Sequence, residues 1–294
     1  MKVFTFLKKC SIIPSVNLPE DNFVNNLQNL HTHSVHCDGK NTLSEIVEFA
    51  IQKGFDSIGF SGHSPVPFES HFAMSERGEK DYRNEVRIVK NQYSDRVKIY
   101  CGIELDTYNK SDLIDYDYVL GSHHYFNIDG EYVGFDRSAD CVKKVIKDYF
   151  HNDGMEFVKA YYSDIAKHLW NTRVDILAHF DIITKNCEKV NLFDWNSPLY
   201  RKYAFEAIDA LKNRIPFFEV NTGAISRGYR TSPYPAINIM KEFKRQGYGA
   251  VITSDCHDGN YLDTGFDMAR DMLLEAGFNE KYVLMDDGFV SVEL

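Results

Sequence analysis

Seven short apolar runs, each ending in a cluster of polar side chains rich in histidine and acids, recur along this chain of 294 residues. Each run is rich in β-branched and aromatic residues and has the length of a strand that is buried on both faces, as parallel strands are. The runs with their polar ends lie at residues 29–33, 57–63, 99–104, 118–124, 174–179, 217–222 and 250–257.

Longer stretches with a helical spacing of apolar residues separate these runs. Apolar residues at i, i+3, i+4, i+7 and i+8 predict a helix over 43–51, with Thr42 as its N-cap and Gly54 as its stop. Similar stripes occur around 154–170, 198–213, 234–246 and 265–276, the last ending at Gly277. A strand followed by a helix, repeated along the chain, indicates right-handed βαβ units and a parallel sheet.

The polar clusters all fall at the carboxyl ends of the predicted strands. In a closed barrel these ends converge on one face, where active sites are built, whereas an open doubly wound sheet concentrates function at one switch point. We therefore predict an α/β fold in the form of a TIM-like barrel. No linker, repeat or low-complexity segment divides residues 1–294, so we expect a single domain, with a hairpin or extra strand pair over 281–294.

Composition excludes several classes of function. Lys and Arg number 33 against 43 Asp and Glu, a net charge of −10, which argues against a basic nucleic-acid-binding face and leaves room for a local anion pocket. The sequence contains no run of about 18 apolar residues, the length that a membrane-spanning helix needs. The start of the chain, residues 1–10, is too short in its apolar stretch and is broken by lysines, so it does not read as a signal peptide, and we expect a cytoplasmic protein.

The six cysteines are scattered without a CxxC pair, which argues against a disulfide framework and against a thiolate zinc site. Cys37 and Cys256 lie inside His/Asp clusters, where a thiol could be a ligand. We favour small buried side chains for both, because the surrounding set of ligands is complete without them.

The strand ends carry a constellation of metal-binding residue types. Two histidines at 31 and 33 fall on the same side of a strand, because strand side chains have a period of two, and Asp255 with His257 repeats that spacing. Imidazole and carboxylate without thiolate suit Zn, Fe or Mn. The residues concerned are His31, His33, Asp38, His63, Glu104, His123, His124, His179, Asp255 and His257.

These motifs, in this order, resemble those of the PHP (polymerase and histidinol phosphatase) family over residues 29–260. Within the family, the second motif at 59–65, the segment after His124 and the stretch at 221–227 are most similar to the stand-alone histidinol-phosphate phosphatases. The resemblance implies a distorted (β/α)7 barrel with a trinuclear metal site at the carboxyl face of the strands. It is carried by the segments His31-Thr32-His33-Ser34, Gly59-Phe60-Ser61-Gly62-His63, Gly102-Ile103-Glu104, Gly121-Ser122-His123-His124, Ala178-His179, Glu219-Val220-Asn221-Thr222 and Ser254-Asp255-Cys256-His257.

The resemblance also implies which residues hold three divalent ions, of Zn, Fe or Mn. Glu104 is expected to bridge two of these ions. The ligand groups are His31, His33, Glu104 and Asp255 for the first ion, Glu104, His124 and His179 for the second, and Asp38, His63 and His257 for the third.

Two histidines beside these motifs leave alternatives open. His36 stands close to Asp38 and could take its place, although the motif spacing favours Asp38. The family pattern takes its ligand from the histidine before the aromatic residue, here His124 before Tyr125, so we expect His123 to point into packing or to support a ligand.

The expected activity is that of a hydrolase, a metal-dependent phosphomonoesterase that converts L-histidinol phosphate to L-histidinol and phosphate in histidine biosynthesis. A hydroxide bridging two metal ions would attack phosphorus, and Glu104, Asp255 and His257 are the expected catalytic residues. Arg227 is the first choice for a bidentate contact with phosphate, whereas Arg230 and Arg137 are nearly as well explained as solvated loop residues.

The substrate amine is expected to meet an acid on the loop 127–137, either Asp129, Glu131 or Asp136. No nucleic acid or membrane partner is expected, and the oligomeric state is open. The alternatives are another PHP phosphoesterase acting on phosphotyrosine or nucleotide phosphates, a polymerase-associated PHP module, and an amidohydrolase. The acidic chain, the intact set of ligands and the bridging Glu104 disfavour the nucleotide, polymerase and amidohydrolase readings respectively.

Overall fold

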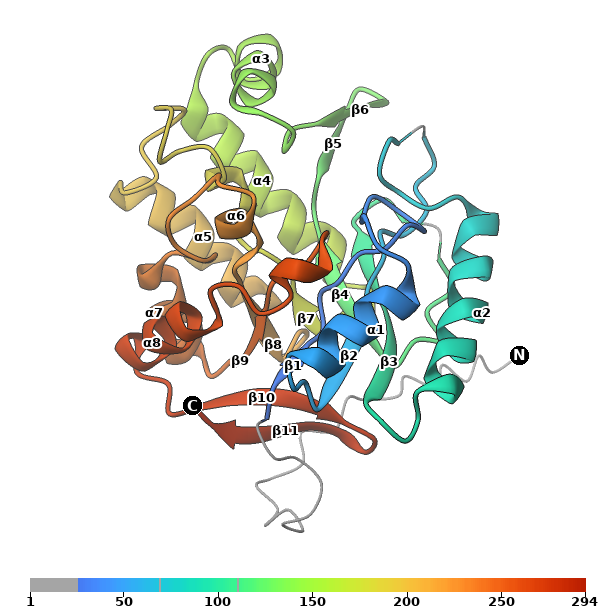
Figure 1. The fold of residues 1–294 in the computed structure, drawn as a ribbon. Coiled ribbons are helices and arrows are strands. Elements are labelled where there is room, and N and C mark those ends of the chain that lie inside the picture. Colours follow the sequence, from blue (N-terminus) through green and yellow to red (C-terminus); the bar gives the residue numbers. More distant parts are fainter. Residues whose placement is uncertain (1–25, 69, 110) are drawn as a thin grey trace, which may run out of the picture.

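The computed structural model describes residues 26–68, 70–109 and 111–294, so the expectation about a signal peptide at residues 1–10 lies outside the described residues. Seven parallel strands form one sheet in the order β1-β2-β3-β4-β7-β8-β9 (Figure 1). They are β1 (Gln28–Asn29), β2 (Ser57–Phe60), β3 (Lys98–Asp106), β4 (Tyr118–Ser122), β7 (Ile176–Leu177), β8 (Phe217–Asn221) and β9 (Gly249–Thr253).

Contacts between the segments that follow β1 and β9 nearly close this sheet into a barrel. Thr32 and Cys256 form an isolated parallel bridge. The amide of His33 donates to the carbonyl of Cys256 at 2.8 Å, and the amide of Cys256 donates to the carbonyl of His31 at 3.0 Å. The predicted α/β barrel is therefore confirmed, and each of the seven predicted runs overlaps one of its strands.

All five predicted helices are present and pack around the barrel (Figure 1). Thr42 caps the first of them through a capping box, in which its side chain accepts from the Glu45 amide and the Glu45 carboxylate accepts from the Thr42 amide. Gly277 ends the last of them with a φ of 92°, a conformation that favours glycine. The five are α1 (Leu43–Gln52), α4 (Gly154–Leu169), α5 (Pro198–Leu211), α7 (Ile237–Gln246) and α8 (Phe266–Ala276).

Helix α7 begins three residues later than the stripe around 234–246 predicts. Tyr234 is held in an antiparallel bridge with Asn221, because each backbone amide donates to the other residue's carbonyl, at 2.8 and 2.9 Å. This pairing keeps residue 234 extended, so that the helix starts only after Pro235.

Two of the longer helices and a hairpin of the described chain were not among the predicted elements, and neither was the four-residue helix α6 (Gly223–Ser226). Helix α2 (Glu76–Gln92) buries only a narrow apolar stripe, including Tyr82, Val86 and Val89, on an otherwise polar helix. The antiparallel pair β5 (Tyr125–Ile128) and β6 (Glu131–Gly134) and helix α3 (Ala139–Tyr149) extend beyond the carboxyl ends of the strands, at the top of Figure 1.

The opposite end of the barrel is covered by the antiparallel pair β10 (Glu280–Met285) and β11 (Gly288–Glu293), drawn at the bottom of Figure 1. Leu284 and Phe289 pack into the same apolar cluster as Leu30 and Phe217 from inside the barrel. The side chain of Gln28 donates to the carbonyl of Leu284 at 2.9 Å and fastens the pair to β1. The amino end of the barrel is thus closed by apolar packing, which leaves the carboxyl end for polar groups.

Tyr118 ties three strands together inside the barrel. Its hydroxyl donates to the carbonyls of Leu30 and Phe60, at 2.5 and 3.0 Å. Its ring lies so close to β2 and β3 that a Cβ atom at Gly59 or Gly102 would come within 2.4 or 2.2 Å of it. Glycine is therefore required at both positions, and the phenol is fully buried.

We predict that Tyr118→Phe lowers the free energy of unfolding by about 1–3 kcal/mol, because two buried carbonyls lose a donor without gaining water. Denaturant unfolding measures this change. Tyr261→Phe, at a tyrosine that is 46% exposed, is the matched control and should leave the stability within about 0.5 kcal/mol. Equal stabilities of the two variants would contradict the prediction.

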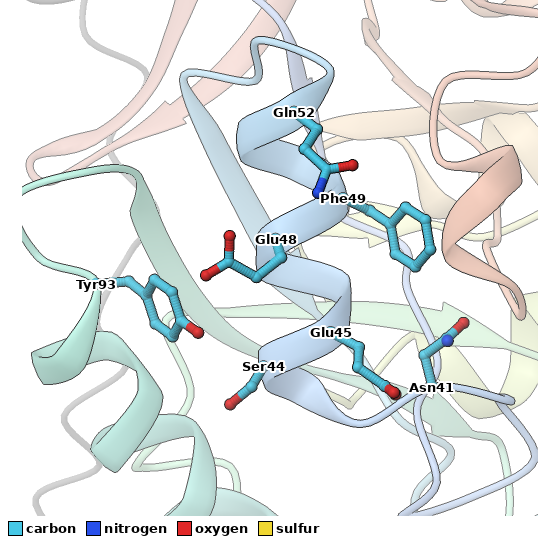
Figure 2. Close-up of a pocket in the computed structure, with 7 residues that line it drawn as sticks. All are labelled: Asn41, Ser44, Glu45, Glu48, Phe49, Gln52 and Tyr93. Atoms are coloured by element: carbon cyan, nitrogen blue, oxygen red, sulfur yellow. The ribbon is translucent and has the colours of Figure 1, made fainter.

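A hollow of about 360 Å³ lies against the outer face of α1 (Figure 2). Its lining includes Glu48, Phe49 and Tyr93, and none of the predicted site residues. Among the described helices, none is long and apolar enough to cross a membrane.

Candidate metal centre

The nine predicted metal ligands converge at the carboxyl ends of the barrel strands. They form four overlapping groups, and in each group the candidate ligand atoms lie within 4.8 Å of one another. The groups are His33, Asp38, His63 and His257; His31, Glu104 and His179; His31, His33 and Asp255; and His63, Glu104 and His124.

Glu104 lies at the centre of this arrangement and is 1% exposed. Its Oε2 is 3.4 Å from His31 Nε2 and 2.8 Å from His63 Nδ1. Its Oε1 is 2.8 Å from His179 Nε2 and 3.4 Å from His124 Nε2. Imidazoles thus face both carboxylate oxygens, which is the arrangement that a carboxylate needs to bridge two cations.

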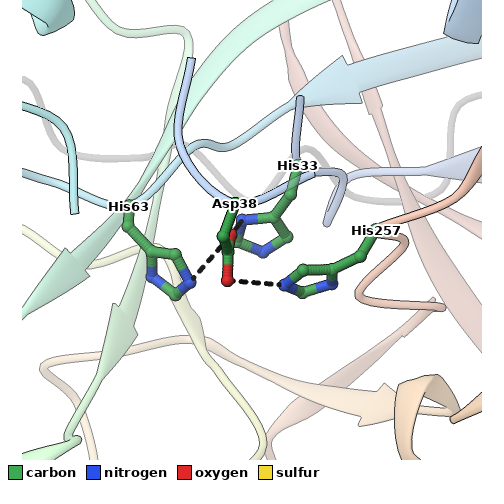
Figure 3. A group of neighbouring side chains, drawn as sticks. All are labelled: His33, Asp38, His63 and His257. Atoms are coloured by element: carbon green, nitrogen blue, oxygen red, sulfur yellow. Dashed lines mark ion pairs between the residues drawn. The ribbon is translucent and has the colours of Figure 1, made fainter. Parts of the chain in front are cut away.

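Asp38 lies among three histidines on the outer side of the centre (Figure 3). Its Oδ1 is 3.5 Å from His33 Nδ1 and 3.7 Å from His63 Nε2, and its Oδ2 is 3.3 Å from His257 Nε2. The loop that carries Asp38 folds back tightly, and a Cβ atom at Gly39 would lie 2.4 Å from the His33 backbone. His33 belongs to two of the four groups, one with Asp38 and one with Asp255. The family resemblance, in contrast, implies a place for His33 only at the first ion.

The two histidines left open by the sequence lie outside these groups. His36 Nε2 is 2.7 Å from Glu85 Oε2 on α2. His123 Nδ1 is 2.8 Å from Thr107 Oγ1, and its ring packs against Phe135. The described structure thus brings Asp38 rather than His36 to the centre, and it turns His123 into packing.

Of the two cysteines near the centre, Cys256 is buried and Cys37 is half-buried. Cys37 Sγ lies 3.4 Å from His33 Nδ1, and Cys256 Sγ lies 3.1 Å from the carbonyl of Asp258. Burial raises the pKa of both thiols to about 12, so neither supplies a thiolate at neutral pH without a metal.

Buried polar atoms test whether these residues fit a metal. Among the described residues, Nε2 of His31, Nε2 of His33 and Oε2 of Glu104 are buried without a hydrogen-bond partner. Such atoms are costly to bury unless something else satisfies them. Since all three are candidate ligand atoms that face one another in a nitrogen and oxygen set, the residues fit divalent cations such as Zn, Fe or Mn.

The carboxylates of the centre are held ionised. Burial raises the pKa of Glu104, but the charges of His63 and His31 outweigh burial and bring it well below its usual value. Burial likewise opposes ionisation of Asp255, where Arg227 and His31 hold the pKa well below its usual value. Both groups are therefore in the ligand form at neutral pH.

The histidines divide according to their partners. Burial lowers the pKa of His31, but Glu219 and other carboxylates raise it well above its usual value. Burial lowers the pKa of His124 as well, but its hydrogen bond with Asp106 brings the net value up to about 9. Burial and neighbouring imidazoles lower the pKa of His33 to about 3. His31 and His124 thus carry protons in the metal-free site, and cations would have to displace them.

Arg227 lies beside the centre, at the C-terminal end of the short helix α6 (Gly223–Ser226). Its Nη2 is 2.8 Å from Asp255 Oδ2, and its Nη1 is 2.8 Å from His257 Nδ1. Burial alone would lower the pKa of Arg227, but Asp255 raises it, so the guanidinium remains charged. A fixed cation therefore stands beside two predicted ligands.

The other two arginines lie elsewhere. Arg230 is 4% exposed, its guanidinium donates to Thr184 Oγ1, and it lies over the ring of Tyr234. Arg137 is exposed. Packing rather than phosphate accounts for Arg230 in this structure.

Only one of the three acids on the loop 127–137 lies near the centre. Asp129 is exposed in the turn between β5 and β6, and Glu131 accepts a hydrogen bond from Tyr149 at 2.9 Å. Asp136 Oδ2 is 3.5 Å from Lys185 Nζ. Burial raises the pKa of Asp136, but Lys185 and the nearby histidines lower it below its usual value, so this acid is a carboxylate close to the centre.

Two carboxylates that support predicted ligands were not assigned a role from the sequence. Glu219 Oε2 accepts from His31 Nδ1 at 2.8 Å, and Asp106 Oδ2 lies 3.2 Å from His124 Nδ1. A signal was present for each, since Glu219 begins the polar end of the predicted run 217–222 and Asp106 follows Glu104 by two residues on the same strand face.

An aromatic wall, also not predicted, borders the centre; it consists of Phe68, Phe72, Tyr125 and Tyr132. The ring centroid of Phe72 is 4.6 Å from that of His63, and its ring stacks on Tyr125 at 5.7 Å. Phe68 stacks on Tyr132 at 4.2 Å and meets Tyr125 edge-on. The wall joins the loop after β2 to the β5–β6 hairpin, so two unpredicted features together form one side of the site.

The model of the PHP domain family matches residues 29–223 of this chain. The chain belongs to the PHP domain family. This PHP protein is 25% identical to the "Probable histidinol-phosphatase" of Schizosaccharomyces pombe, over 84% of this chain and 86% of the relative. It is 24% identical to the histidinol-phosphatase of Bacillus subtilis, over 80% of this chain and 94% of the relative.

The fold of this PHP protein is similar to that of histidinol phosphate phosphatase from Lactococcus lactis, which was crystallised with zinc, L-histidinol and phosphate. The TM-score is 0.68 at 20% identity, and the match covers 90% of this chain and 98% of the other. At this identity the likeness establishes the barrel fold of the PHP protein.

We predict that the metal-free PHP protein loses stability as the pH rises from about 6.5 to 9. A histidine whose pKa is raised on folding contributes stability that is complete below its unfolded value of about 6.5 and is lost as the pH passes the folded value. His124, at about 9, defines this window, and the pKa values of His31 and His63 are raised in the same direction. Urea unfolding of chelator-treated protein at the two pH values measures the loss.

The exposed His151 supplies the matched control for this prediction, because His151→Gln should leave the loss intact while His124→Gln reduces it. A metal-free protein that is equally stable or more stable at pH 9 would contradict the assignment of charge in the site.

Proposed function

We propose that this PHP protein is a metal-dependent histidinol-phosphatase, which hydrolyses L-histidinol phosphate to L-histidinol and phosphate. The observation that carries the proposal is the convergence of nine candidate nitrogen and oxygen ligands, with the buried Glu104 at their centre and the guanidinium of Arg227 beside them. The histidinol-phosphatase relatives supply the substrate. A place in histidine biosynthesis, in the cytoplasm, belongs to the same proposal.

The nine ligands would hold three divalent ions, with Glu104 between two of them. When bound, the ions would neutralise the phosphoryl oxygens, lower the pKa of a water that attacks phosphorus and assist the leaving alkoxide. Hydrolysis of a phosphomonoester then requires no serine or cysteine nucleophile from the chain, which agrees with the protonated state of Cys37.

Arg227 would orient the phosphate, because a guanidinium matches phosphate oxygens bidentately. The contact with Asp255 fixes its Nη2 and leaves the planar group at the edge of the centre. Nδ1 of His257 also lies 2.9 Å from the carbonyl of Asp255. If Nδ1 donates its proton to that carbonyl, then Nε2 of His257 offers a lone pair to a cation. Nη1 of Arg227 donates one N–H to the same carbonyl at 3.2 Å, and its second N–H would remain for a phosphate oxygen.

Asp136 and the aromatic wall would receive the rest of the substrate. Histidinol carries an ammonium group and a flat imidazole. The carboxylate of Asp136 suits the ammonium group, and the partly exposed ring of Phe72, between His63 and Tyr125, suits the imidazole. Both contacts lie on the side of the centre that the β5–β6 hairpin forms.

The decisive experiment is phosphate release by the metal-loaded protein from histidinol phosphate, phosphotyrosine and nucleotide monophosphates. We expect a strong preference for histidinol phosphate that is lost when a chelator is added. Metal-dependent activity on another substrate of the panel would reject the substrate while retaining the phosphatase class.

Glu104→Gln should abolish turnover in a folded protein, because it removes the charge that would bridge two ions; near-normal activity of a fully metallated variant would reject the assigned centre.

We predict that Asp136→Asn raises the KM for histidinol phosphate by about tenfold or more, because it removes the charge proposed to pair with the substrate ammonium group, a charge that also faces Lys185 at 3.5 Å. Steady-state kinetics measure the change. Asp129→Asn and Glu131→Gln, on the exposed turn of the same loop, are the matched controls and should leave KM unchanged. An unchanged KM in Asp136→Asn would exclude this acid as the ammonium contact.

A further inference from the structure

Glu219 is a fully buried carboxylate on β8 that touches two of the predicted ligands from behind. Its Oε2 accepts from His31 Nδ1 at 2.8 Å. Its Oε1 faces the backbone amide of His179 at 3.4 Å and accepts from the side-chain amide of Asn221. One carboxylate on β8 therefore connects a ligand that follows β1 to a ligand that follows β7.

The hydrogen bond with Glu219 decides which nitrogen of His31 can bind a cation. Because the carboxylate only accepts, Nδ1 must carry a proton, so Nε2 is the nitrogen that offers its lone pair once a cation displaces the second proton. That nitrogen is buried without a hydrogen-bond partner among the described residues, and it lies 3.4 Å from Glu104. Partners of this kind orient ligand histidines and raise their basicity.

His179 carries the second half of the connection. Its φ is 22°, a backbone conformation that residues other than glycine rarely adopt. Such conformations persist only where the surrounding structure holds them. Its amide faces Glu219 Oε1, and its Nε2 lies 2.8 Å from Glu104 Oε1. Glu219 thus supports the backbone of one ligand and the ring of another, on opposite oxygens of Glu104.

We propose that Glu219 is a positioning residue of the metal centre, which sets the His31 tautomer and holds His31 and His179 together around Glu104. This inference rests on the proposed metal-dependent function. It assigns Glu219 no contact with metal or substrate. Its Oε2 contacts His31, and its Oε1 contacts the His179 amide and the Asn221 side chain.

Glutamine at this position cannot satisfy the same neighbours. If its amide group faces His31, it donates to Nδ1 and places the proton on Nε2, which blocks the ligand atom. If its amide group faces the other way, it meets the donors of Asn221 and His179. Rotation of the Asn221 amide does not remedy this, because its oxygen already accepts from the Gly223 amide at 2.9 Å.

The test compares Glu219→Gln with Glu79→Gln, a matched control that alters a buried carboxylate of α2, which accepts from the Tyr116 hydroxyl at 2.7 Å. Zn²⁺ is titrated calorimetrically into the metal-free form of each protein, and folding is checked by circular dichroism. We expect the dissociation constant of the site to rise about 10- to 100-fold in Glu219→Gln and to be unchanged in Glu79→Gln. Equal affinities of Glu219→Gln and the wild type would overturn the inference.

A second measurement needs no variant and covers the case in which Glu219→Gln fails to fold. In the Zn²⁺-loaded wild type with 15N-labelled histidine, NMR should show His31 protonated at Nδ1, with that proton shifted downfield by a strong hydrogen bond. A His31 protonated at Nε2 would overturn the inference. If the wild type binds no Zn²⁺ at all, the proposed metal-dependent function fails first, which is a different outcome from a wild type that binds and a variant that binds equally well.

Discussion

The structure depends on one buried charge, the carboxylate of Glu104. A buried carboxylate is tolerated only when opposite charges, hydrogen bonds or metal ions compensate it. Its partners His31, His63, His124 and His179 follow four different strands, β1, β2, β4 and β7. The carboxylate can therefore be satisfied only when those strands stand around it in barrel order, so that the electrostatics of the site and the closure of the fold are one constraint.

The barrel could be predicted from the sequence because parallel strands buried on both faces are continuous apolar runs, and because the residues after them are unusually rich in histidine and acids. The missed helix α2 shows where this reading stops. Its buried stripe is narrow, since the rest of its surface is solvated, and periodicity is a weak signal when so few positions are apolar. The late start of α7 depends on a bridge between Tyr234 and Asn221, which no local pattern contains.

The candidate ligands could be predicted from the sequence, but the residues that support them could not. Residue types that bind metals stand out at strand ends, and the structure brings all nine of them together; their roles as ligands stay a prediction. The supporting carboxylates were not assigned, because the role of Glu219 or Asp106 depends on which ring nitrogen each one faces, and that is a property of the assembled barrel. The aromatic wall has the same origin, since its rings come from a loop and a hairpin that are distant in the sequence.

The two ends of the barrel divide stability and chemistry between them. At the amino end, Leu284 and Phe289 close an apolar interior in which Tyr118 joins three strands. At the carboxyl end, His179 and Asp255 hold φ values of 22° and 45°, and like groups crowd together, which packing alone would not favour. The histidines at the carboxyl end stay close together because the apolar packing at the amino end holds the strands in place. Divalent cations at the carboxyl end would replace repulsion between imidazolium groups with coordination, so that loading of the centre and stability of the barrel would reinforce each other.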